Sequence, residues 1–411
     1  MQAILISIGS ELTSGRTVNT NAAFLARRLQ SVGIPCRHHL AVPDDRHLIV
    51  EAIRTARQQA ELVIVTGGLG PTFDDITAEA IAEAAGRPLA FSAPAAARVR
   101  RFYRQHRRRV HQLALRQAAI PRGATALPNP VGTAPGIWLP LEDALLVALP
   151  GVPREMEAIV EGSVLPRLRR TPRAAISSKT VRTIGVVELQ IQEAIRTITI
   201  PSGLEVGLYP NLMAVDVSLT MTGHPPRKAQ QQLDRLERAL RRRLGEAVYG
   251  RDDQTLEDVV SEMLMRRRLT LAVAESCTGG LVADRLTNVP GSSRYLIMSV
   301  VAYHNRVKQE LLGVSPSALT RYGAVSSQVA AAMAQGARRR AGTDVGLAIT
   351  GIAGPTGATS SKPVGLVYMA LADRRRTRVK RFHFHGDRRA VKEQAAQMAL
   401  DWLRRWALGM A

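Results

Sequence analysis

One segment of this 411-residue chain restricts its fold more than any other. The apolar run Leu269–Ala274 breaks into the polar, glycine-ending stretch Glu275–Gly280, and a helical pattern starts at once with Leu281. This order predicts a buried β-strand that turns sharply into a helix, the repeating unit of an α/β fold. Ser276, in that turn, would face free backbone N–H groups of the helix that could receive a developing oxyanion. Ser276 is therefore a candidate nucleophile, and the alternative is a simple helix cap.

The pattern of apolar residues divides the chain into three segments. Residues 1–170 alternate apolar runs with amphipathic helices, which predicts βαβ units around a largely parallel sheet. Residues 175–250 indicate a small α+β module, entered through the turn-rich stretch 169–173. Residues 251–411 hold a helix before the Ser276 turn, further apolar segments and a final helix. We expect three domains with these boundaries, and an α/β fold class.

The net charge of +22 raises the question of a nucleic-acid partner. Arginines account for most of it, and they are spread over the surfaces of predicted helices and loops rather than gathered in one motif. No aromatic residues stand between them to stack on bases. We therefore expect nonspecific, salt-sensitive binding at most, and no specific nucleic-acid partner.

The sequence also restricts the compartment. It has no uncharged apolar stretch long enough to cross a membrane, and residues 1–9 predict a first β-strand rather than a signal peptide. Its two cysteines, Cys36 and Cys277, stand far apart and have no metal-binding spacing, which suits a reducing environment. We expect a cytoplasmic protein without a membrane partner.

Two further motifs follow predicted strands in the last segment. Tyr303 and Lys308 stand just past an apolar run, at the kind of strand end where open α/β sheets bind ligands. No histidine has an obvious carboxylate partner, so a desolvated Lys308 could serve Ser276 as its base. The alternative for Lys308 is a solvated surface lysine. The stretch Thr350–Gly357 is rich in glycine, which has no side chain, so its backbone could come close to a bound phosphate or sugar.

Together these motifs resemble the C-terminal domain of the competence/damage-inducible protein A (CinA) family. The matching stretches are Ala274–Gly280, Val289–Ser293, Tyr303–Lys308, Gly323–Ser326, Thr350–Pro355, Lys362–Gly365 and Gly386–Arg388. The resemblance implies a nicotinamide mononucleotide amidohydrolase that needs no cofactor, with Ser276 as nucleophile, Lys308 as base and Tyr303 as a helper. It also implies substrate contacts from Thr278, Gly279, Asn305, Thr350, Gly351, Gly354 and Arg388. His304 departs from the serine that is usual in the family.

The first segment carries its own strong motif. A buried strand at 62–66 runs into the glycine-rich turn 67–70, and Asp74 and Asp75 precede a helix. Backbone N–H groups of such a turn can bind phosphates, and the two carboxylates could hold a divalent cation or could simply cap the helix. Glu11, after the first strand, would add a third carboxylate at the same edge of the sheet.

This segment resembles the CinA domain that is similar to molybdopterin-binding proteins of the MoaB/MogA type. The resemblance implies an ADP-ribose pyrophosphatase that depends on a divalent metal ion, Mg²⁺ or a similar one. The implied nucleotide contacts are Gly67, Gly68, Gly70 and Thr72, and the implied metal ligands are Asp74, Asp75 and Glu11. Asn19 and Ala114 stand where the family usually has an aspartate and an asparagine. Residues 175–250 resemble the family's KH-like linker, without a Gly-x-x-Gly loop.

The expected partners are small nucleotides, namely nicotinamide mononucleotide and ADP-ribose, together with a second copy of the chain in a homodimer. Two rival functions remain open at this point. One is a nucleic-acid-associated competence factor, suggested by the charge and the KH-like linker. The other is a nucleotide- or pterin-binding protein without turnover.

Overall fold

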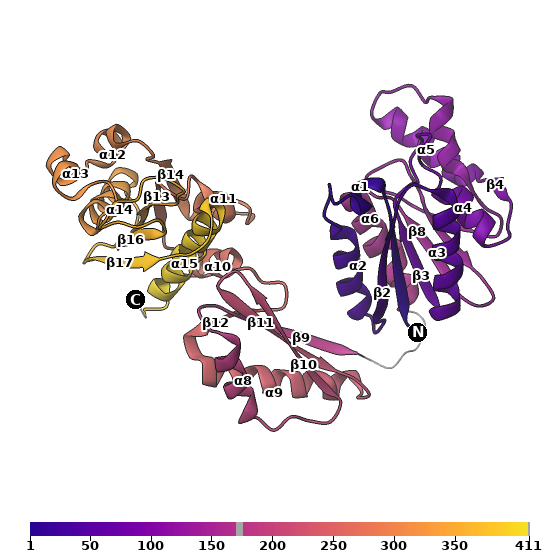
Figure 1. The fold of residues 1–411 in the computed structure, drawn as a ribbon, viewed down its shortest axis with the longest axis horizontal. Helices are drawn as coiled ribbons and strands as arrows, with labels where there is room; N and C mark the ends of the chain where they lie inside the picture. Colours follow the sequence, from indigo (N-terminus) through magenta and orange to yellow (C-terminus); the bar gives the residue numbers. More distant parts are fainter. Residues whose placement is uncertain (170–175, 410–411) are drawn as a thin grey trace. The chain divides into compact units, whose positions relative to one another are not determined.

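The computed structural model describes residues 1–169 and 176–409. Most of the predicted entry turn at 169–173 therefore lies outside the described residues. The chain forms two compact units, the first of Met1–Ser177 with Met221–Gln230 and the second of Ser178–Thr220 with Gln231–Ala411 (Figure 1). The second unit contains the body of the middle module and the whole C-terminal domain.

The first unit is built on a six-stranded sheet with the strand order β2-β1-β3-β8-β7-β6. These strands are β2 (Cys36–Val42), β1 (Ala3–Ile8), β3 (Leu62–Thr66), β8 (Leu145–Leu149), β7 (Gly136–Pro140) and β6 (Thr125–Leu127). The first four run parallel to their neighbours, while β7 is antiparallel to both β8 and β6. β4 (Leu89–Phe91) and β5 (Ala119–Pro121) form a separate antiparallel pair. The predicted, largely parallel sheet is confirmed.

Helices cover both faces of this sheet. One apolar cluster contains residues of α3 (Arg46–Gln59) and α4 (Thr77–Ala84), and the other contains residues of α2 (Thr20–Gln30) and α6 (Pro153–Ile159). Burial on two sides explains why the central strands are uninterrupted apolar runs. The remaining helical segments are α1 (Ser10–Thr13), α5 (Ala93–Gln105), the 3₁₀ segment Gln112–Ala118, a π-helical turn at Val160–Val164 and α7 (Leu165–Leu168).

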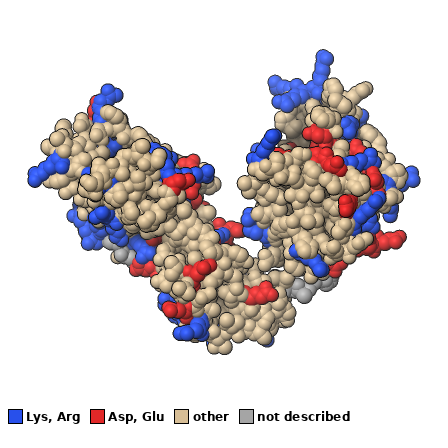
Figure 2. Space-filling model, viewed as in Figure 1, with Lys and Arg blue, Asp and Glu red and all other residues tan. Residues whose placement is uncertain are grey.

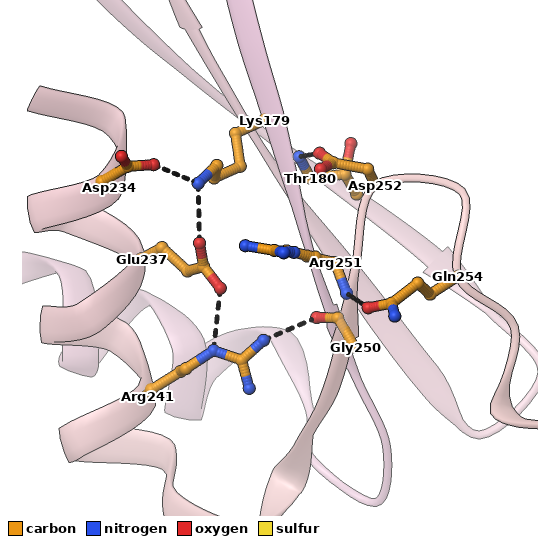
Figure 3. Close-up of polar contacts among 9 residues, drawn as sticks. All are labelled: Lys179, Thr180, Asp234, Glu237, Arg241, Gly250, Arg251, Asp252 and Gln254. Carbon is orange, nitrogen blue, oxygen red and sulfur yellow. Dashed lines mark hydrogen bonds and ion pairs between the residues drawn. The ribbon is translucent and has the colours of Figure 1, made fainter. Parts of the chain in front are cut away.

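The middle module is a four-stranded sheet with the order β10-β11-β9-β12. Its elements are β9 (Ser177–Thr183), α8 (Glu188–Arg196), β10 (Leu204–Asn211), β11 (Ala214–Met221), α9 (Pro226–Leu244) and β12 (Val248–Arg251). A buried charge network joins helix to sheet, because Lys179 on β9 donates to Asp234 and Glu237 on α9 (Figure 3). Arg241 extends it, donating to Glu237 at 2.8 Å and to the carbonyl of Gly250 at 3.3 Å. Each buried charge in this network thus has a partner.

The C-terminal domain contains a five-stranded sheet with the order β14-β13-β15-β16-β17. Strands β14 (Leu296–Val301), β13 (Leu271–Glu275) and β15 (Val345–Gly351) are parallel, and β16 (Leu366–Ala372) and β17 (Thr377–His383) continue the sheet antiparallel. One face packs on α10 (Leu256–Arg267), α11 (Leu281–Thr287) and α15 (Arg388–Ala407), and the other on α12 (Asn305–Leu312) and α14 (Ser327–Ala341). Helix α13 (Pro316–Tyr322) precedes α14. The carboxyl ends of the three parallel strands lie at one edge, which carries the predicted motifs.

Basic side chains are spread over the faces of both units that Figure 2 shows, between acidic ones. No helix among the described residues is both long and apolar enough to span a membrane.

Candidate active site

Ser276 directly follows β13 and lies at the carboxyl-terminal edge of the C-terminal sheet. The N–H of Ser276 donates to the carbonyl of Ile349 on β15 at 3.0 Å, which fixes the residue between the two central strands. The preceding residue, Glu275, is fully buried. Its carboxylate accepts hydrogen bonds from the backbone N–H groups of Gly280, Val282 and Ala283 at 3.0, 3.2 and 2.9 Å.

This arrangement corrects one expectation from the sequence. Helix α11 begins at Leu281, five residues after Ser276, and the carboxylate of Glu275 already takes N–H groups of its first turn. Those groups are therefore not free to stabilise an oxyanion at Ser276. The N–H groups of Cys277 and Thr278, which donate to no backbone carbonyl among the described residues, remain for that role.

Lys308 lies on α12 with its side chain almost completely buried. Its Nζ is 3.2 Å from Ser276 Oγ, 2.7 Å from the carbonyl oxygen of Ala302 and 3.1 Å from that of Tyr303. Burial lowers the pKa of Lys308 below its ordinary value, because the charged form loses its hydration. A neutral amine has two N–H groups and one lone pair. The two carbonyls can accept both N–H groups, so the lone pair is left facing Ser276.

Hydrogen bonds of two side chains, His304 and Tyr303, hold the start of α12 in place. His304 caps α12, since its Nδ1 accepts from the N–H of Arg306 at 3.2 Å, and this is a role that serine commonly fills. The hydroxyl of Tyr303 accepts from Arg388 Nη2 at 2.6 Å, while Arg388 Nη1 donates to the carbonyl of Gly354 at 2.7 Å. Arg388 therefore connects the start of α15 to Tyr303 and to the glycine-rich loop after β15.

Cys277, the neighbour of Ser276, is buried, and burial raises the pKa of its thiol to about 12. A thiol of this kind stays protonated at neutral pH and is a poor nucleophile. Thr278 is also buried, and its hydroxyl lacks a hydrogen-bond partner in the described part of the chain.

A cavity of about 740 Å³ lies beside this site. Its wall includes Gly354 of the glycine-rich loop and the start of the 20-residue helix α15, which contributes both cations and carboxylates: Arg388, Arg389, Lys392, Asp387 and Glu393. Arg388 links the cavity to Tyr303, and Lys392 lies close to Gly279, in the turn after Ser276. The volume is in the range of sites for small organic ligands.

The remaining residues implied as substrate contacts, Thr350, Gly351 and Asn305, each have a local structural setting. The hydroxyl of Thr350 donates to the carbonyl of Ala324 at 2.9 Å, so it ties β15 to a neighbouring loop. Gly351 lies where a Cβ would collide with Val367 on β16, which makes it a packing glycine. Asn305 is exposed at the start of α12.

In the first unit, the glycine turn lies at the carboxyl end of β3. Gly67 and Gly68 both have positive φ, and their carbonyls accept from the hydroxyl and the N–H of Thr77 at 2.9 and 3.1 Å. A Cβ on Gly67 would collide with the carbonyl of Ile8 on β1. The glycines thus allow the loops after β1 and β3 to pack closely.

The three carboxylates expected to bind a metal are not gathered. Among the described residues there is no group of three His, Cys, Asp or Glu side chains that could hold an ion. Asp75 accepts from the N–H and hydroxyl of Thr72 and lies under Gly70, and Glu11 folds against Gly9 of its own turn. The metal site of Glu11, Asp74 and Asp75 is therefore not assembled in this structure.

The two family departures have local roles. Asn19 caps α2, since its side chain accepts from the N–H of Ala22 at 3.1 Å, and Ala114 is buried. Sequence reasoning gave no role to Glu275, although a carboxylate at the end of an apolar strand, six residues before a helix, is an unusual position that could have signalled it.

Comparisons with known proteins cover all three domains. The family described as CinA C-terminal domain matches residues 253–407, the probable molybdopterin binding domain matches residues 4–170, and the damage-inducible protein CinA KH domain matches residues 178–250.

Full-length relatives agree with these matches. A putative competence-damage inducible protein of Moorella thermoacetica is 44% identical over 402 residues, which are 97% of each chain. A CinA-like protein of Geotalea uraniireducens is 41% identical over 415 residues, 100% of this chain and 98% of that one. Among solved structures, a CinA protein of Thermoplasma acidophilum is 39% identical and covers 41% of this chain and 97% of its own, with a TM-score of 0.39.

Proposed function

Because this chain belongs to the CinA family of competence/damage-inducible proteins, we propose that its C-terminal domain hydrolyses nicotinamide mononucleotide to nicotinate mononucleotide and ammonia. The observation that carries this proposal is the environment of Lys308. Two backbone carbonyls accept from its amine, and the third contact of Nζ is with Ser276 Oγ at 3.2 Å. A buried lysine of lowered pKa beside a serine is the arrangement that Ser–Lys acyl transfer requires.

The chemistry follows from this geometry. Ser276 Oγ attacks the carboxamide carbon as its proton passes to Lys308 Nζ, and the carbonyl oxygen becomes an oxyanion. The N–H groups of Cys277 and Thr278, which donate to no backbone carbonyl among the described residues, could donate to that oxyanion. Lys308 then returns the proton to the departing nitrogen, and ammonia leaves. Water, deprotonated by Lys308, cleaves the resulting ester and restores Ser276.

The adjoining cavity supports a nucleotide substrate. Arg388 and Lys392 supply positive charge on its wall, which suits a phosphate group. The two carboxylates of the wall already have partners, since Asp387 caps α15 and Glu393 pairs with Arg389. The ring of Tyr303 is exposed beside the site and is available to pack on the pyridine ring. Arg388 holds the hydroxyl of Tyr303 at 2.6 Å, so it would orient that ring.

The direct test is ammonia release from nicotinamide mononucleotide by the pure full-length protein. Ser276→Ala should lower the rate by several powers of ten, because it removes the nucleophile. Cys277→Ala is the matched control from the adjacent position and should keep most of the activity. An active Ser276→Ala variant, or an inactive Cys277→Ala variant that is still folded, would contradict the assignment.

For the N-terminal domain we propose metal-assisted nucleotide binding at the loops after β1 and β3, where glycines bring backbone close together. Mg²⁺ commonly binds through one or two carboxylates together with substrate phosphates, and exposed Asp74 could supply one of them. Calorimetry with ADP-ribose, with and without Mg²⁺, tests this. Binding that is equal in Asp74→Asn and wild type would exclude that carboxylate.

A further inference from the structure

A second positively charged cavity lies in the N-terminal domain, between the start of α5 and the helical segment 160–168. It has a volume of about 690 Å³, and its lining residues are Ser92, Pro94, Arg98, Ala124, Thr125, Ala126, Pro128, Gly162, Ser163, Pro166 and Arg167. We call it the α5 cavity. Its wall includes none of the glycine turn 67–70 and none of the carboxylates near that turn.

Both cations of the α5 cavity lack an acidic partner. Arg98 is exposed on α5, and Arg167 is half-buried with its guanidinium 5.3 Å from the centre of the Trp138 ring. Neither has a carboxylate within ion-pair distance among the described residues, and no Asp or Glu lines the cavity. The nearby Glu161 is already paired with Arg28 at 2.8 Å. The cavity therefore has a net positive wall that an anion would neutralise.

Ser163 provides the second, independent observation. It lies in the π-helical turn Val160–Val164, a distortion that is frequent at functional sites. Ser163 lines the α5 cavity and is only 8% exposed, and its hydroxyl makes no hydrogen bond within residues 1–169 and 176–409, although its oxygen is not one of the fully buried atoms without a partner. A hydroxyl that lines a cavity and has no partner within the protein keeps its donor and its acceptor positions for a ligand there.

The rest of the wall defines the class of ligand. Two more hydroxyls, those of Ser92 and Thr125, line the cavity, and Ser92 also caps the 13-residue helix α5. Guanidinium groups and hydroxyls are the donors that bind phosphate oxygens. The prolines and alanines of the list offer apolar surface beside them, and the volume exceeds what an inorganic ion needs.

We propose that the α5 cavity binds the phosphate group of a small phosphorylated molecule through Arg98, Arg167 and the hydroxyl of Ser163. The apolar wall then packs against the body of that molecule. This site is separate from the glycine turn of the same domain and from the Ser276 site.

The test is calorimetric titration of the full-length protein with inorganic phosphate and with ribose 5-phosphate, in buffers of equal ionic strength. Arg98→Gln and Ser163→Ala should each weaken binding by about tenfold, the effect of one charge-assisted hydrogen bond. Arg100→Gln is the matched control, since Arg100 is exposed on the same helix but does not line the cavity, and it should leave affinity unchanged. Tighter binding of ribose 5-phosphate identifies a phosphate ester as the ligand, and equal affinities identify free phosphate.

Thermal unfolding separates a binding role of Ser163 from a structural one. In phosphate-free buffer, Ser163→Ala should unfold at the same temperature as wild type or higher, because the removed hydroxyl has no partner to lose. Phosphate should then raise the unfolding temperature of wild type more than that of the variant. Three results would overturn the proposal. The first is equal affinity for phosphate in wild type and both cavity variants, and the second is weaker binding by Arg98→Gln but not by Ser163→Ala. The third is a lowered unfolding temperature of Ser163→Ala with unchanged affinity.

Discussion

Glu275→Gln is the substitution that most directly tests how the serine turn is held. The carboxylate of Glu275 accepts three backbone N–H groups, and the side chain is fully buried. A hydrogen bond to a charged group contributes about 1.5–3 kcal/mol, against about 0.5–1.5 kcal/mol for a neutral one. Three bonds that lose their charge therefore cost about 3 kcal/mol. The amide nitrogen of Gln would also face an N–H donor, and the charge at the start of α11 would be lost.

Urea unfolding followed by tryptophan fluorescence measures this loss. Two of the three tryptophans, Trp402 and Trp406, lie on α15 in the same domain as Glu275. With a urea dependence of roughly 2 kcal/mol per molar, a loss of about 3 kcal/mol moves the midpoint down by about 1.5 M. Glu262→Gln on α10 is the control, since its half-exposed side chain forms a surface i,i+4 pair with Arg266, and we expect a change below about 0.5 kcal/mol.

The same variant should lose activity, because Ser276 follows directly on Glu275 and the turn between β13 and α11 would shift. We expect kcat for ammonia release to fall while the affinity for substrate changes less, since the cavity wall at α15 is untouched. A Glu275→Gln protein with the wild-type urea midpoint and the wild-type rate would refute the role given to this carboxylate.

Four further predictions concern buried or partly buried groups. Lys308→Arg should lower ammonia release by about a thousandfold while the protein stays folded, because arginine cannot act as a base near neutral pH. In wild type, the rate should fall as the pH drops through the lowered pKa of Lys308, because only the neutral amine accepts the serine proton; a rate independent of pH would argue against a lysine base. Burial raises the pKa of Cys277 to about 12 and that of Cys36 to about 11, so mass spectrometry should find neither alkylated by iodoacetamide at neutral pH until urea unfolds the chain. Lys179→Met should destabilise the middle module by about 3 kcal/mol, because the carboxylate of Glu237 would stay buried without that cation; an unchanged thermal unfolding curve would contradict this.

Much of the fold could be predicted from periodicity, because the central strands are buried on both faces. The strand expected at 62–66 is β3, the first strand expected within residues 1–9 is β1, and the final helix expected in the last segment is α15. Strand β2 was not predicted, because it lies at an edge and most of its side chains are exposed. Such a strand has no apolar pattern for the sequence to reveal.

The candidate site shows where sequence reasoning ends. The motifs indicated Ser276 and Lys308, but their spacing could not show that two carbonyls from the end of β14 surround the lysine amine. The N–H groups expected to face Ser276 turned out to bind Glu275, since a buried carboxylate competes for the same helix N-terminus. Interactions of this kind depend on three-dimensional proximity, which a single sequence leaves open.

The carbonyl groups around Lys308 also bear on how such a site can change during evolution. The atoms that accept from its amine are main-chain oxygens of residues 302 and 303, so they persist whatever side chains these positions carry. A change of side chain at position 303 should therefore alter the contact with Arg388 and with the substrate while the two carbonyl contacts of the lysine remain. An insertion or deletion between residues 302 and 308 would instead change the register of the backbone and abolish the base, so variation in length, not in residue type, should be what selection removes from this segment.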